Sequence, residues 1–571
     1  MPKLSGGDIV VRALEDERIP FTFGIPGTHN IELYDALARS KSVRPILVTD
    51  EQSASFMADG VWRASGQMAC ANLVPGAGLT HALSGIAEAF LDNVPMLVLG
   101  CGIRRDTKHA YQLHDIDQIA IAKPVTKAQF RPDTGQDLYH AIRRACAIAR
   151  EGVPGPVFVE VPANLYLFTS DVDFAWNPIP QELALEVNLV RPAAEVLNAA
   201  KRPLLYVGMG AVNAAAEIVA LAECLDAPVA TTFSGKGVFP ENHPLALWPG
   251  FGEAAPRFAR DVASECDATL AIGCRFGEVG TGSYGLTPPR PLIHVDIDPG
   301  VLGRNYETDV AIASDARAFV DALMPFLSAR RADARLREQI RAGHEDVEHE
   351  WLEHKTDRVS PYRLMNALQK HFGPNTVFTA DSGNGLFLGM ECLRLEKPRR
   401  FLGPVDYSCM GYSVPAGLGA KLAAPTAPVV ALAGDGAFLM TGLEMITAVS
   451  EAIPLVIIVL RDRELAQIAQ FQQTALSRKA CSELGDYDVT TLANAVGLEA
   501  LRLDHNEEID AVLIKALDMT DAGKAVVIDV AIDYSLKTHF TKGVIKTNLL
   551  RLPWADRLRF IGRAVTRKIL P

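Results

Sequence analysis

The stretch from Val429 to Gln473 decides the fold: VVALAGDGAFLMTGLEMITAVSEAIPLVIIVLRDRELAQIAQFQQ. It begins with a short apolar run, Val429 to Ala433, which predicts a buried strand. Glycines in the following Gly434-Asp435-Gly436 permit a tight turn with the backbone close to a ligand. A stretch of helical length then leads to a second apolar run, Leu455 to Leu460. Strands that alternate with helices in this way predict a parallel sheet.

A carboxylate follows each of these predicted strands, Asp435 after the first and Asp462 after the second. Ligands bind at the carboxyl ends of the strands in open α/β sheets, so we expect both acids at one sheet edge. Two carboxylates and a glycine turn at that edge can hold a magnesium ion and a diphosphate. An ordinary turn with Asp462 as a helix cap explains the same spacing equally well, because a three-residue motif is weak evidence.

Length and composition limit the classes of protein. The chain has 571 residues, 49% hydrophobic and 22% charged, which predicts a soluble globular protein of about three or four domains. Its net charge of −12 argues against a nucleic-acid partner. Its 9 cysteines include no C-x-x-C pair, which indicates reduced thiols in a cytoplasmic protein. The first residues do not resemble a signal peptide, and no apolar run reaches the length of about 20 residues needed to span a membrane.

Three α/β blocks and a tail follow one another along the chain. Strand-like runs such as FTFGI and VFVEV alternate with helical stretches in the first block, as PLLYVGMG and PLIHVDID do in the second. The third block contains the opening stretch, and its likeness to the first suggests two related α/β layers. We expect a linker at 170–190 and a solvated, highly charged helix within 330–358. We therefore predict an α/β fold of three doubly wound parallel-sheet domains and a basic tail, at residues 1–170, 190–340, 359–535 and 536–571.

Glycine-rich turns and one acidic pair also follow strands of the first block. Gly24 to His29 (GIPGTH) and Pro75 to Gly78 (PGAG) are such turns, and Asp50-Glu51 lies where a predicted strand meets a helix. These turns exceed what helix connections require, so we expect a cleft at that edge. A carboxylate that merely favours the helix N-terminus is the alternative for the acidic pair.

These features together resemble the thiamine-diphosphate (ThDP) enzymes, within them the acetolactate synthase, benzaldehyde lyase and pyruvate oxidase group. Gly434-Asp435-Gly436, with Asp462 placed 27 positions after Asp435, looks like the family's metal–diphosphate motif. The likeness covers about residues 7–535 in the right order. Further matching segments are FGIPG (23–27), DEQSASFMADGVWRASG (50–66), DNVPMLVLG (92–100), PVTK (124–127) and CMGYSVPAGLGA (409–420).

The resemblance implies a domain order and an assembly. The three domains would be pyrimidine-binding, central and diphosphate-binding. The cofactor would lie between the first domain of one subunit and the third domain of another, in a homodimer or homotetramer.

The resemblance also assigns metal ligands. Asp435 and Asp462 would bind Mg2+ through their side chains, and Glu464 through its backbone carbonyl. Asp462 stands where the family usually has the second Asn of an Asn-Asn pair, and Arg461 replaces the first. A carboxylate binds magnesium at least as well as an amide, so the resemblance still implies a metal site, with unusual local charge.

Two sets of residues would contact the cofactor itself. Glu51 would hydrogen-bond N1′ of the aminopyrimidine, Met410 would hold the cofactor bent, and Ser408 would offer its carbonyl to the 4′-amino group. In isolation, a methionine such as Met410 is more often core filling. The positions that match diphosphate contacts are Gly383, Asn384, Gly436 and Ala437, with Leu465-Ala466 in place of a common glycine-containing step.

Substrate-facing positions would include His29, His114 and Gln467. His29 matches a position that faces the reacting centre in some relatives and could relay protons, whereas a capping or surface histidine is the alternative for His29. Leu113 and Phe471 stand where acetolactate synthases carry Phe and Trp. Simple pyruvate decarboxylases carry an acid at the position of Ile468, so the resemblance disfavours plain decarboxylation to a free aldehyde.

The central domain poses a second cofactor question, because related synthases and oxidases bind FAD there. Arg275-Phe276 is followed by GEVGTGSYG and not by the acidic, Arg-containing run of the flavin-binding synthases. FAD is possible, but the prediction is against it.

The tail from Ser535 carries nine Lys or Arg and a single acid, Asp556. Four of its apolar residues fall at helical spacing, which suits a basic amphipathic helix at a membrane surface. A helix that docks on the subunit or covers the active site is the interpretation that we favour. The four residues are Leu558, Ile561, Val565 and Ile569.

The function implied is a ThDP- and Mg2+-dependent carboligase or lyase that resembles acetolactate synthase. It would decarboxylate a 2-oxo acid such as pyruvate and transfer the acyl-anion equivalent to a second carbonyl. A 2-oxo acid decarboxylase or 2-hydroxy ketone lyase for larger or aromatic substrates is one alternative. A non-catalytic scaffold that keeps the fold is another, for which Arg461-Asp462 is the hint.

Overall fold

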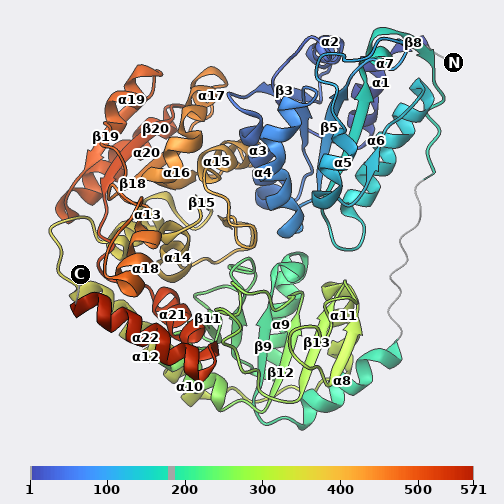
Figure 1. The fold of residues 1–571 in the computed structure, drawn as a ribbon. Helices are drawn as coiled ribbons and strands as arrows, with labels where there is room; N and C mark the ends of the chain where they lie inside the picture. The colour runs from blue at the N-terminus through green and yellow to red at the C-terminus, as the bar shows by residue number, and fades with distance from the viewer. Residues whose placement is uncertain (1–2, 178–186, 570–571) are drawn as a thin grey trace.

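Three six-stranded sheets, all of them parallel, organise the chain (Figure 1). The structure is a computed structural model and describes residues 3–177 and 187–569. Helices cover both faces of each sheet; the inner strands are almost wholly buried, whereas edge strands such as β3 (Arg44–Leu47) and β14 (Val310–Ala313) are partly exposed. The predicted fold class, three doubly wound α/β domains, is confirmed.

The N-terminal sheet has the strand order β3-β2-β4-β5-β7-β6. A short antiparallel pair, β1 (Lys3–Ser5) with β8 (Thr169–Asp171), closes this part of the chain. The strands of the N-terminal sheet are β2 (Phe21–Gly24), β3 (Arg44–Leu47), β4 (Cys70–Leu73), β5 (Met96–Gly102), β6 (Gln129–Phe130) and β7 (Pro156–Pro162). Its helices are α1 (Gly6–Asp16), α2 (Ile31–Arg39), α3 (Glu51–Ser65), α4 (Ala77–Leu91), α5 (Gln118–Ala122), α6 (Gly135–Arg150) and α7 (Ala163–Leu167).

The C-terminal sheet repeats that order along the chain, as β16-β15-β17-β18-β20-β19. The likeness of the first and third blocks therefore extends to their topology. Its strands are β15 (Val377–Ala380), β16 (Phe401–Leu402), β17 (Val429–Gly434), β18 (Val456–Arg461), β19 (Glu499–Leu503) and β20 (Val526–Ala531). Its helices are α13 (Pro361–Phe372), α14 (Asn384–Cys392), α15 (Ser413–Ala423), α16 (Asp435–Thr441), α17 (Met445–Ser450), α18 (Ala466–Leu476), α19 (Val489–Ala495) and α20 (Ile509–Asp521).

The central sheet has a different order, β11-β10-β9-β12-β13-β14, in which the direction of winding reverses between β9 and β12. Its strands are β9 (Pro203–Val207), β10 (Val229–Thr231), β11 (Ala246–Pro249), β12 (Ala268–Ile272), β13 (Leu292–Asp296) and β14 (Val310–Ala313). Its helices are α8 (Val187–Ala199), α9 (Ala215–Leu225), α10 (Arg257–Ser264) and α11 (Ala316–Leu323), followed by the long α12 (Ala334–Glu353).

Helices α3 and α15 join the N- and C-terminal domains face to face. A Cβ atom at Gly60 would lie 2.2 Å from the carbonyl oxygen of Ala416, and one at Gly419 would lie 2.1 Å from that of Met57. Only glycine permits so close an approach of two backbones. Because Met57 faces Gly419 and Gly60 faces Ala416, the two helices run antiparallel.

Two sequence expectations about the connections need correction. The expected linker at 170–190 overlaps β8, which ends at Asp171, and α8, which begins at Val187, while 178–186 lie outside the described residues. Helix α12 is not solvated all round, because it buries one stripe against the central domain. The charged sequence hides this stripe, whose members are Leu336, Ile340, Gly343, Val347 and Trp351.

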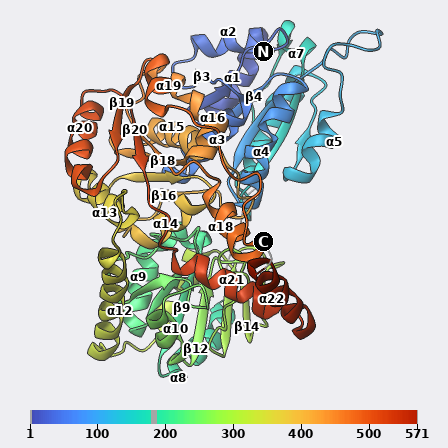
Figure 2. The ribbon, with the colours of Figure 1, turned by 60° about the vertical axis from the view of Figure 1, so that its left-hand side comes forward.

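The tail forms two helices, α21 (His539–Arg551) and α22 (Trp554–Ile569), which lie beside the central domain in Figure 2. Helix α21 docks tightly, since a Cβ at Gly543 would lie 2.2 Å from the carbonyl oxygen of Glu253. The ring of Phe540 stacks on Phe387 with 4.4 Å between centroids. Trp554 and Leu558 of α22, by contrast, are 70% and 51% exposed.

Candidate cofactor site

Asp435 stands at the end of β17 and opens α16, where the Gly434-Asp435-Gly436 turn places it. Its side chain is buried and accepts three backbone N–H groups, from Gly436 at 2.8 Å, Asp462 at 3.1 Å and Arg463 at 2.6 Å. These bonds tie the turn after β17 to the turn after β18. The two predicted metal ligands therefore lie at one sheet edge, as the spacing predicts.

Asp462 follows β18 and accepts the N–H of Glu464 at 3.2 Å. The Glu464 carboxylate pairs with Lys479. Arg461 turns toward β20, where its guanidinium pairs with Asp529 at 2.6 Å and Asp504 at 3.3 Å. Its positive charge is thus balanced by these two acids.

The charges of this turn fit a divalent cation. Burial, with the charge of Asp435 second, raises the pKa of Asp462 to about 7. Burial also raises the pKa of Asp435, although its three amide bonds oppose the shift. The buried carboxylate of Asp435 and the half-buried carboxylate of Asp462 are hard oxygen donors, of the kind that Mg2+ prefers.

The residues predicted to contact a diphosphate lie around the same turn. Gly383 precedes α14 with φ +109°, a conformation that suits glycine, and Asn384 begins that helix. A Cβ at Gly383 would lie 3.6 Å from Oε1 of Gln467, near the start of α18. Leu465 precedes α18, and its Cδ2 lies 2.6 Å from where Gly436 would carry a Cβ. Ala437 lies in the first turn of α16, and Ala466 begins α18.

The segment between β16 and α15 carries Ser408 and Met410. Ser408 has φ +67°, and its Oγ lies 2.6 Å from Oγ of Ser382. Cε of Met410 lies 3.6 Å from the Cβ position of Gly436, so this segment meets the Gly434–Gly436 turn. Every predicted site residue of the C-terminal domain thus lies at this one edge.

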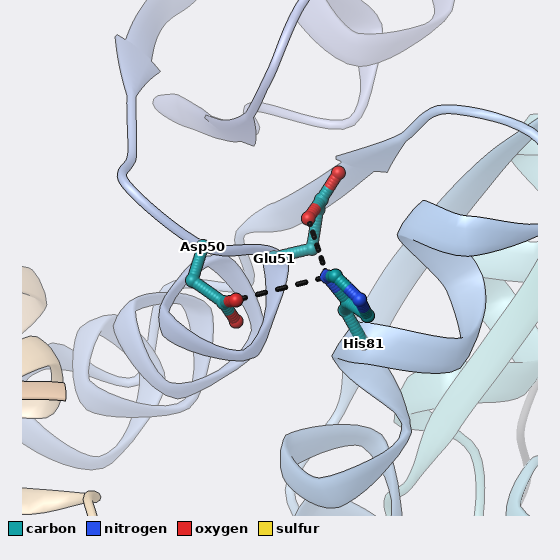
Figure 3. A group of neighbouring side chains, drawn as sticks. All are labelled: Asp50, Glu51 and His81. Atoms are coloured by element: carbon teal, nitrogen blue, oxygen red, sulfur yellow. Dashed lines mark ion pairs between the residues drawn. The ribbon is translucent and has the colours of Figure 1, made fainter. Parts of the chain in front are cut away.

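Glu51 begins α3, and Asp50 caps that helix by accepting the N–H of Gln52 at 2.8 Å. Figure 3 shows the ring of His81 in α4 turned toward both acids, with its Nδ1 3.3 Å from Oε2 of Glu51 and 3.7 Å from Oδ2 of Asp50. Glu51 is buried, whereas the side chain of His81 is 57% exposed. A Cβ at Gly78 would lie 3.0 Å from Oε1 of Glu51, so the PGAG turn packs on this carboxylate.

His29 and His114 also lie at this edge of the N-terminal domain. Their rings meet edge to face with 5.4 Å between centroids, and burial, with His114 second, lowers the pKa of His29. The carbonyl of His114 lies 3.6 Å from the Cβ position of Gly76 in the PGAG turn. A cavity of about 360 Å3 beside them is lined by Thr28, His29, Ile31, Glu32, Arg104, Gln112, Leu113, Ala163 and Leu167. Of the three strand ends expected to form a cleft, the Gly24–His29 turn lines this cavity, whereas Pro75–Gly78 and Asp50-Glu51 do not.

The two groups of predicted site residues do not meet within one chain. Glu51 begins α3, and Ser413, just after Met410, begins α15. Because these helices run antiparallel, their first residues lie at opposite ends of the pair, about 18 Å apart along the axis. We call these two groups of predicted site residues the half-sites; within one chain they lie toward opposite ends of the α3–α15 pair.

Comparison with known proteins agrees with this geometry. Residues 4–121, 190–323 and 381–530 match the N-terminal TPP binding, central and C-terminal TPP binding domains of thiamine pyrophosphate enzymes. The chain belongs to the thiamine pyrophosphate enzyme family. It is therefore a thiamine-diphosphate-dependent enzyme, the two cofactor names being synonyms.

Relatives within the thiamine pyrophosphate enzyme family match almost end to end. The acetolactate synthase large subunit of Corynebacterium glutamicum is 31% identical over 558 residues, covering 92% of this chain and 86% of its own. The isozyme 3 large subunit of Escherichia coli is 29% identical and covers 94% and 96%. The probable large subunit of Methanocaldococcus jannaschii is 31% identical and covers 90% of each chain.

Three residues at the half-sites were not predicted from the sequence. Tyr487 donates its hydroxyl to the carbonyl of Asp435 at 2.9 Å, from a loop with no strand or motif to mark it. His81 is a lone histidine on a helix. Asp381, which accepts the N–H of Tyr412 at 2.6 Å, follows β15 and could have been found by the strand-end rule used for Asp435.

The central domain has its own cleft of about 600 Å3 at the carboxyl ends of its strands. Its two basic residues are already engaged, because Arg275 pairs with Asp406 at 2.6 Å and Arg150 pairs with Glu17. Neither arginine is therefore free to pair with the diphosphate of a dinucleotide. The acids of the lining are Asp92, Asp296, Asp298, Asp315 and Asp406.

Proposed function

We propose that the chain is a ThDP- and Mg2+-dependent carboligase that decarboxylates a 2-oxo acid such as pyruvate and passes the acyl-anion equivalent to a second carbonyl compound. The observation that supports this proposal most is at one edge of the C-terminal sheet. There, Asp435, Asp462 and the backbone of Glu464 lie close to Met410 and Gly436. The names of the relatives, acetolactate synthase large subunits, support this reaction class.

The roles of the chain's own residues follow from their places. Asp435, Asp462 and the Glu464 carbonyl would hold Mg2+, while Gly383, Asn384, Gly436, Ala437, Leu465 and Ala466 would border the diphosphate. Bound ThDP supplies the carbanion chemistry that side chains lack. Glu51 would hold a hydrogen bond at N1′ of the pyrimidine from its buried position, and the Ser408 carbonyl would accept from the 4′-amino group. The negative lining of the central cleft supports an enzyme without FAD.

Residues on both half-sites would face the substrate. His29 and His114 lie in edge-to-face contact, where one ring can pass a proton to a substrate oxygen. Gln467 lies near Gly383 at the start of α18, followed by the half-exposed Ile468. The cavity beside His29 favours a second candidate, a decarboxylase or 2-hydroxy ketone lyase for larger or aromatic substrates.

A second copy of the chain would complete each site. The antiparallel α3–α15 pair separates Glu51 from Met410 of the same chain, so each half-site needs a partner half. Helices α16 and α17 and the intervening turn also expose an apolar stripe, which supports burial against another copy in a homodimer or homotetramer. The stripe consists of Leu439, Met440, Leu443, Ile446 and Val449, which are 41–58% exposed.

The tail supports a peripheral contact with an anionic membrane surface. Trp554 and Leu558 are exposed on α22, and Arg559 and Arg563 stand on its opposite side. No helix in residues 3–177 or 187–569 is long and apolar enough to cross a bilayer. Deleting 553–571 removes α22 and leaves α21. The truncated protein is therefore expected to bind vesicles of anionic lipid less than the full chain does, while its turnover persists. Equal binding of both forms to the vesicles would reject the membrane contact.

The reaction class is tested with Glu51→Gln. Wild-type protein with ThDP and Mg2+ is offered a panel of 2-oxo acids, with and without aldehyde or 2-oxo acid acceptors, and CO2 and ligated products are measured. Glu51→Gln is expected to lose at least 100-fold in CO2 release, the scale of a lost acid–base group. Asp50→Asn is the matched control, because Asn still caps α3. A wild type that binds ThDP but releases no CO2 from any acid would support the scaffold alternative.

A further inference from the structure

The segment of residues 403–411, between β16 and α15, is held by the other ThDP-binding domain of the same chain. Arg63 donates to the carbonyl of Gly403 at 3.1 Å. Asp92 accepts the N–H groups of Val405 at 3.1 Å and Asp406 at 3.0 Å. Three of the backbone groups that fix the start of this segment are therefore bonded to side chains of α3 and the end of α4.

The contact nearest the cofactor residues comes from Glu88. Oε2 of this α4 residue accepts the N–H of Cys409 at 3.0 Å, between Ser408 and Met410. Glu88 is fully buried and Cys409 is half-buried. If the Glu88 carboxyl group were removed, water would therefore not take its place as the acceptor of the Cys409 N–H. A backbone N–H left without an acceptor in such a place costs about 1–3 kcal/mol, enough to move the segment.

The acids of this cluster are linked by one guanidinium. Arg63 pairs with Asp59 at 2.6 Å and with Asp92 at 2.9 Å, and Tyr412 donates its hydroxyl to Asp59 at 2.5 Å. Arg63 holds the pKa of Asp92 low against the effect of burial. Burial and the charge of Asp92 raise the pKa of Glu88 well above its usual range. This shift favours the neutral form of Glu88, while its Oε2 accepts the N–H of Cys409.

We infer that Glu88 is a positioning residue for the cofactor: from the N-terminal domain it fixes the 403–411 segment so that Ser408 and Met410 face the Gly434–Gly436 turn. The contact of Met410 Cε with the Gly436 position, at 3.6 Å, is the geometry that it maintains. Glu88 contacts neither substrate nor cofactor in this role and acts through the amide of Cys409. The inference rests on the proposed function for the identity of the ligand, ThDP.

Two substitutions separate a positioning role from a merely structural one. Glu88→Gln keeps an acceptor for the N–H of Cys409, whereas Glu88→Leu keeps a similar volume and removes the acceptor. In Glu88→Leu, amide hydrogen exchange of the peptide 403–412 in the cofactor-free protein is expected to rise at least tenfold, and ThDP affinity in Mg2+ to fall at least tenfold. In Glu88→Gln both quantities are expected to stay within threefold of wild type.

Glu391→Gln is the matched control, because Glu391 is also a buried acid, bonded to Trp351 at 2.9 Å away from the 403–411 segment. It should change neither quantity. If Glu88→Leu does not fold, Glu88→Ala takes its place, and the wild-type amides of Val405, Asp406 and Cys409 must still exchange slowly. Fast exchange there, wild-type behaviour of the Leu or Ala variant, or a Gln variant as impaired as Leu would each overturn the inference. A wild type that binds no ThDP would instead refute the proposed function, while the exchange result in cofactor-free protein would still stand.

Discussion

At the scale of single residues, the Asp435–Asp462 pair is the most strained arrangement of charge in the half-site. Both acids have raised pKa values, and Asp462 reaches about 7 through burial and its neighbour's charge. A cation between them removes this repulsion. Without one, the pair destabilises the fold that carries it.

Asp462→Asn is expected to stabilise the metal-free protein by on the order of 1 kcal/mol, because one charge of the pair disappears. The amide can still bind the metal, so Mg2+ with ThDP should raise the unfolding temperature of the variant less than that of wild type, though still measurably. Thermal unfolding with and without both ligands gives the comparison. Asp486→Asn serves as the control, since Asp486 is exposed and pairs only with Arg463 at 3.2 Å. A metal-free variant less stable than wild type would contradict this account.

At the scale of elements, the α3–α15 crossing depends on two glycines. Gly60→Ala would place its methyl group 2.2 Å from the Ala416 carbonyl oxygen, so the helices must separate. We expect a loss of about 1–3 kcal/mol or more in stability, as for other overpacked cores. Chemical denaturation measures this, with Gly485→Ala as the control because nothing lies within 4 Å of its Cβ position. Equal stability of the two variants would show that the crossing is looser than described.

Helix α12 carries a pH-dependent contact through His344. Arg394 can only donate, so Nδ1 of His344 accepts its N–H at 2.9 Å, and Nε2 donates to the carbonyl of Ala246 at 2.9 Å. Burial, with Arg394 second, lowers the pKa of His344 to about 3. Between that value and about 6.5, the unfolded chain binds a proton that the folded chain does not.

Stability is therefore expected to fall as the pH falls from about 6.5 toward 3, by up to about 1.4 kcal/mol per pH unit from this one group. His344→Gln should flatten this part of the curve, measured as unfolding midpoints at several pH values. His349→Gln, an exposed histidine on the same helix, should leave the slope unchanged. Parallel curves for wild type and His344→Gln would rule out this histidine as the source.

At the scale of the whole molecule, the sequence predicts most of the features that leave a local pattern along the chain. The strands Val429–Gly434 and Val456–Arg461 consist almost wholly of apolar residues, because both faces of a parallel strand are buried. The sequence pattern therefore predicts both strands. Gln129–Phe130 and Phe401–Leu402 are strands of two residues and leave no pattern. The predicted half-site residues follow from strand ends and from family motifs, which fix positions along the chain. The hydrogen bond from Cys409 to Glu88 joins residues 321 positions apart, so no local spacing in the sequence predicts it.

The antiparallel glycine crossing has a consequence for genetics. If each site draws Glu51 from one chain and Asp435 from the other, a dimer of one Glu51→Gln chain and one Asp435→Asn chain contains one doubly damaged site and one intact site. Two inactive proteins, dissociated and reassociated as an equal mixture, should then recover about one quarter of wild-type activity, since half of the dimers are mixed and each has one working site of two. Two lesions placed in the same half, such as Asp435→Asn and Asp462→Ala, should never complement each other in this way. A defect in one allele could then be masked by a different defect in another.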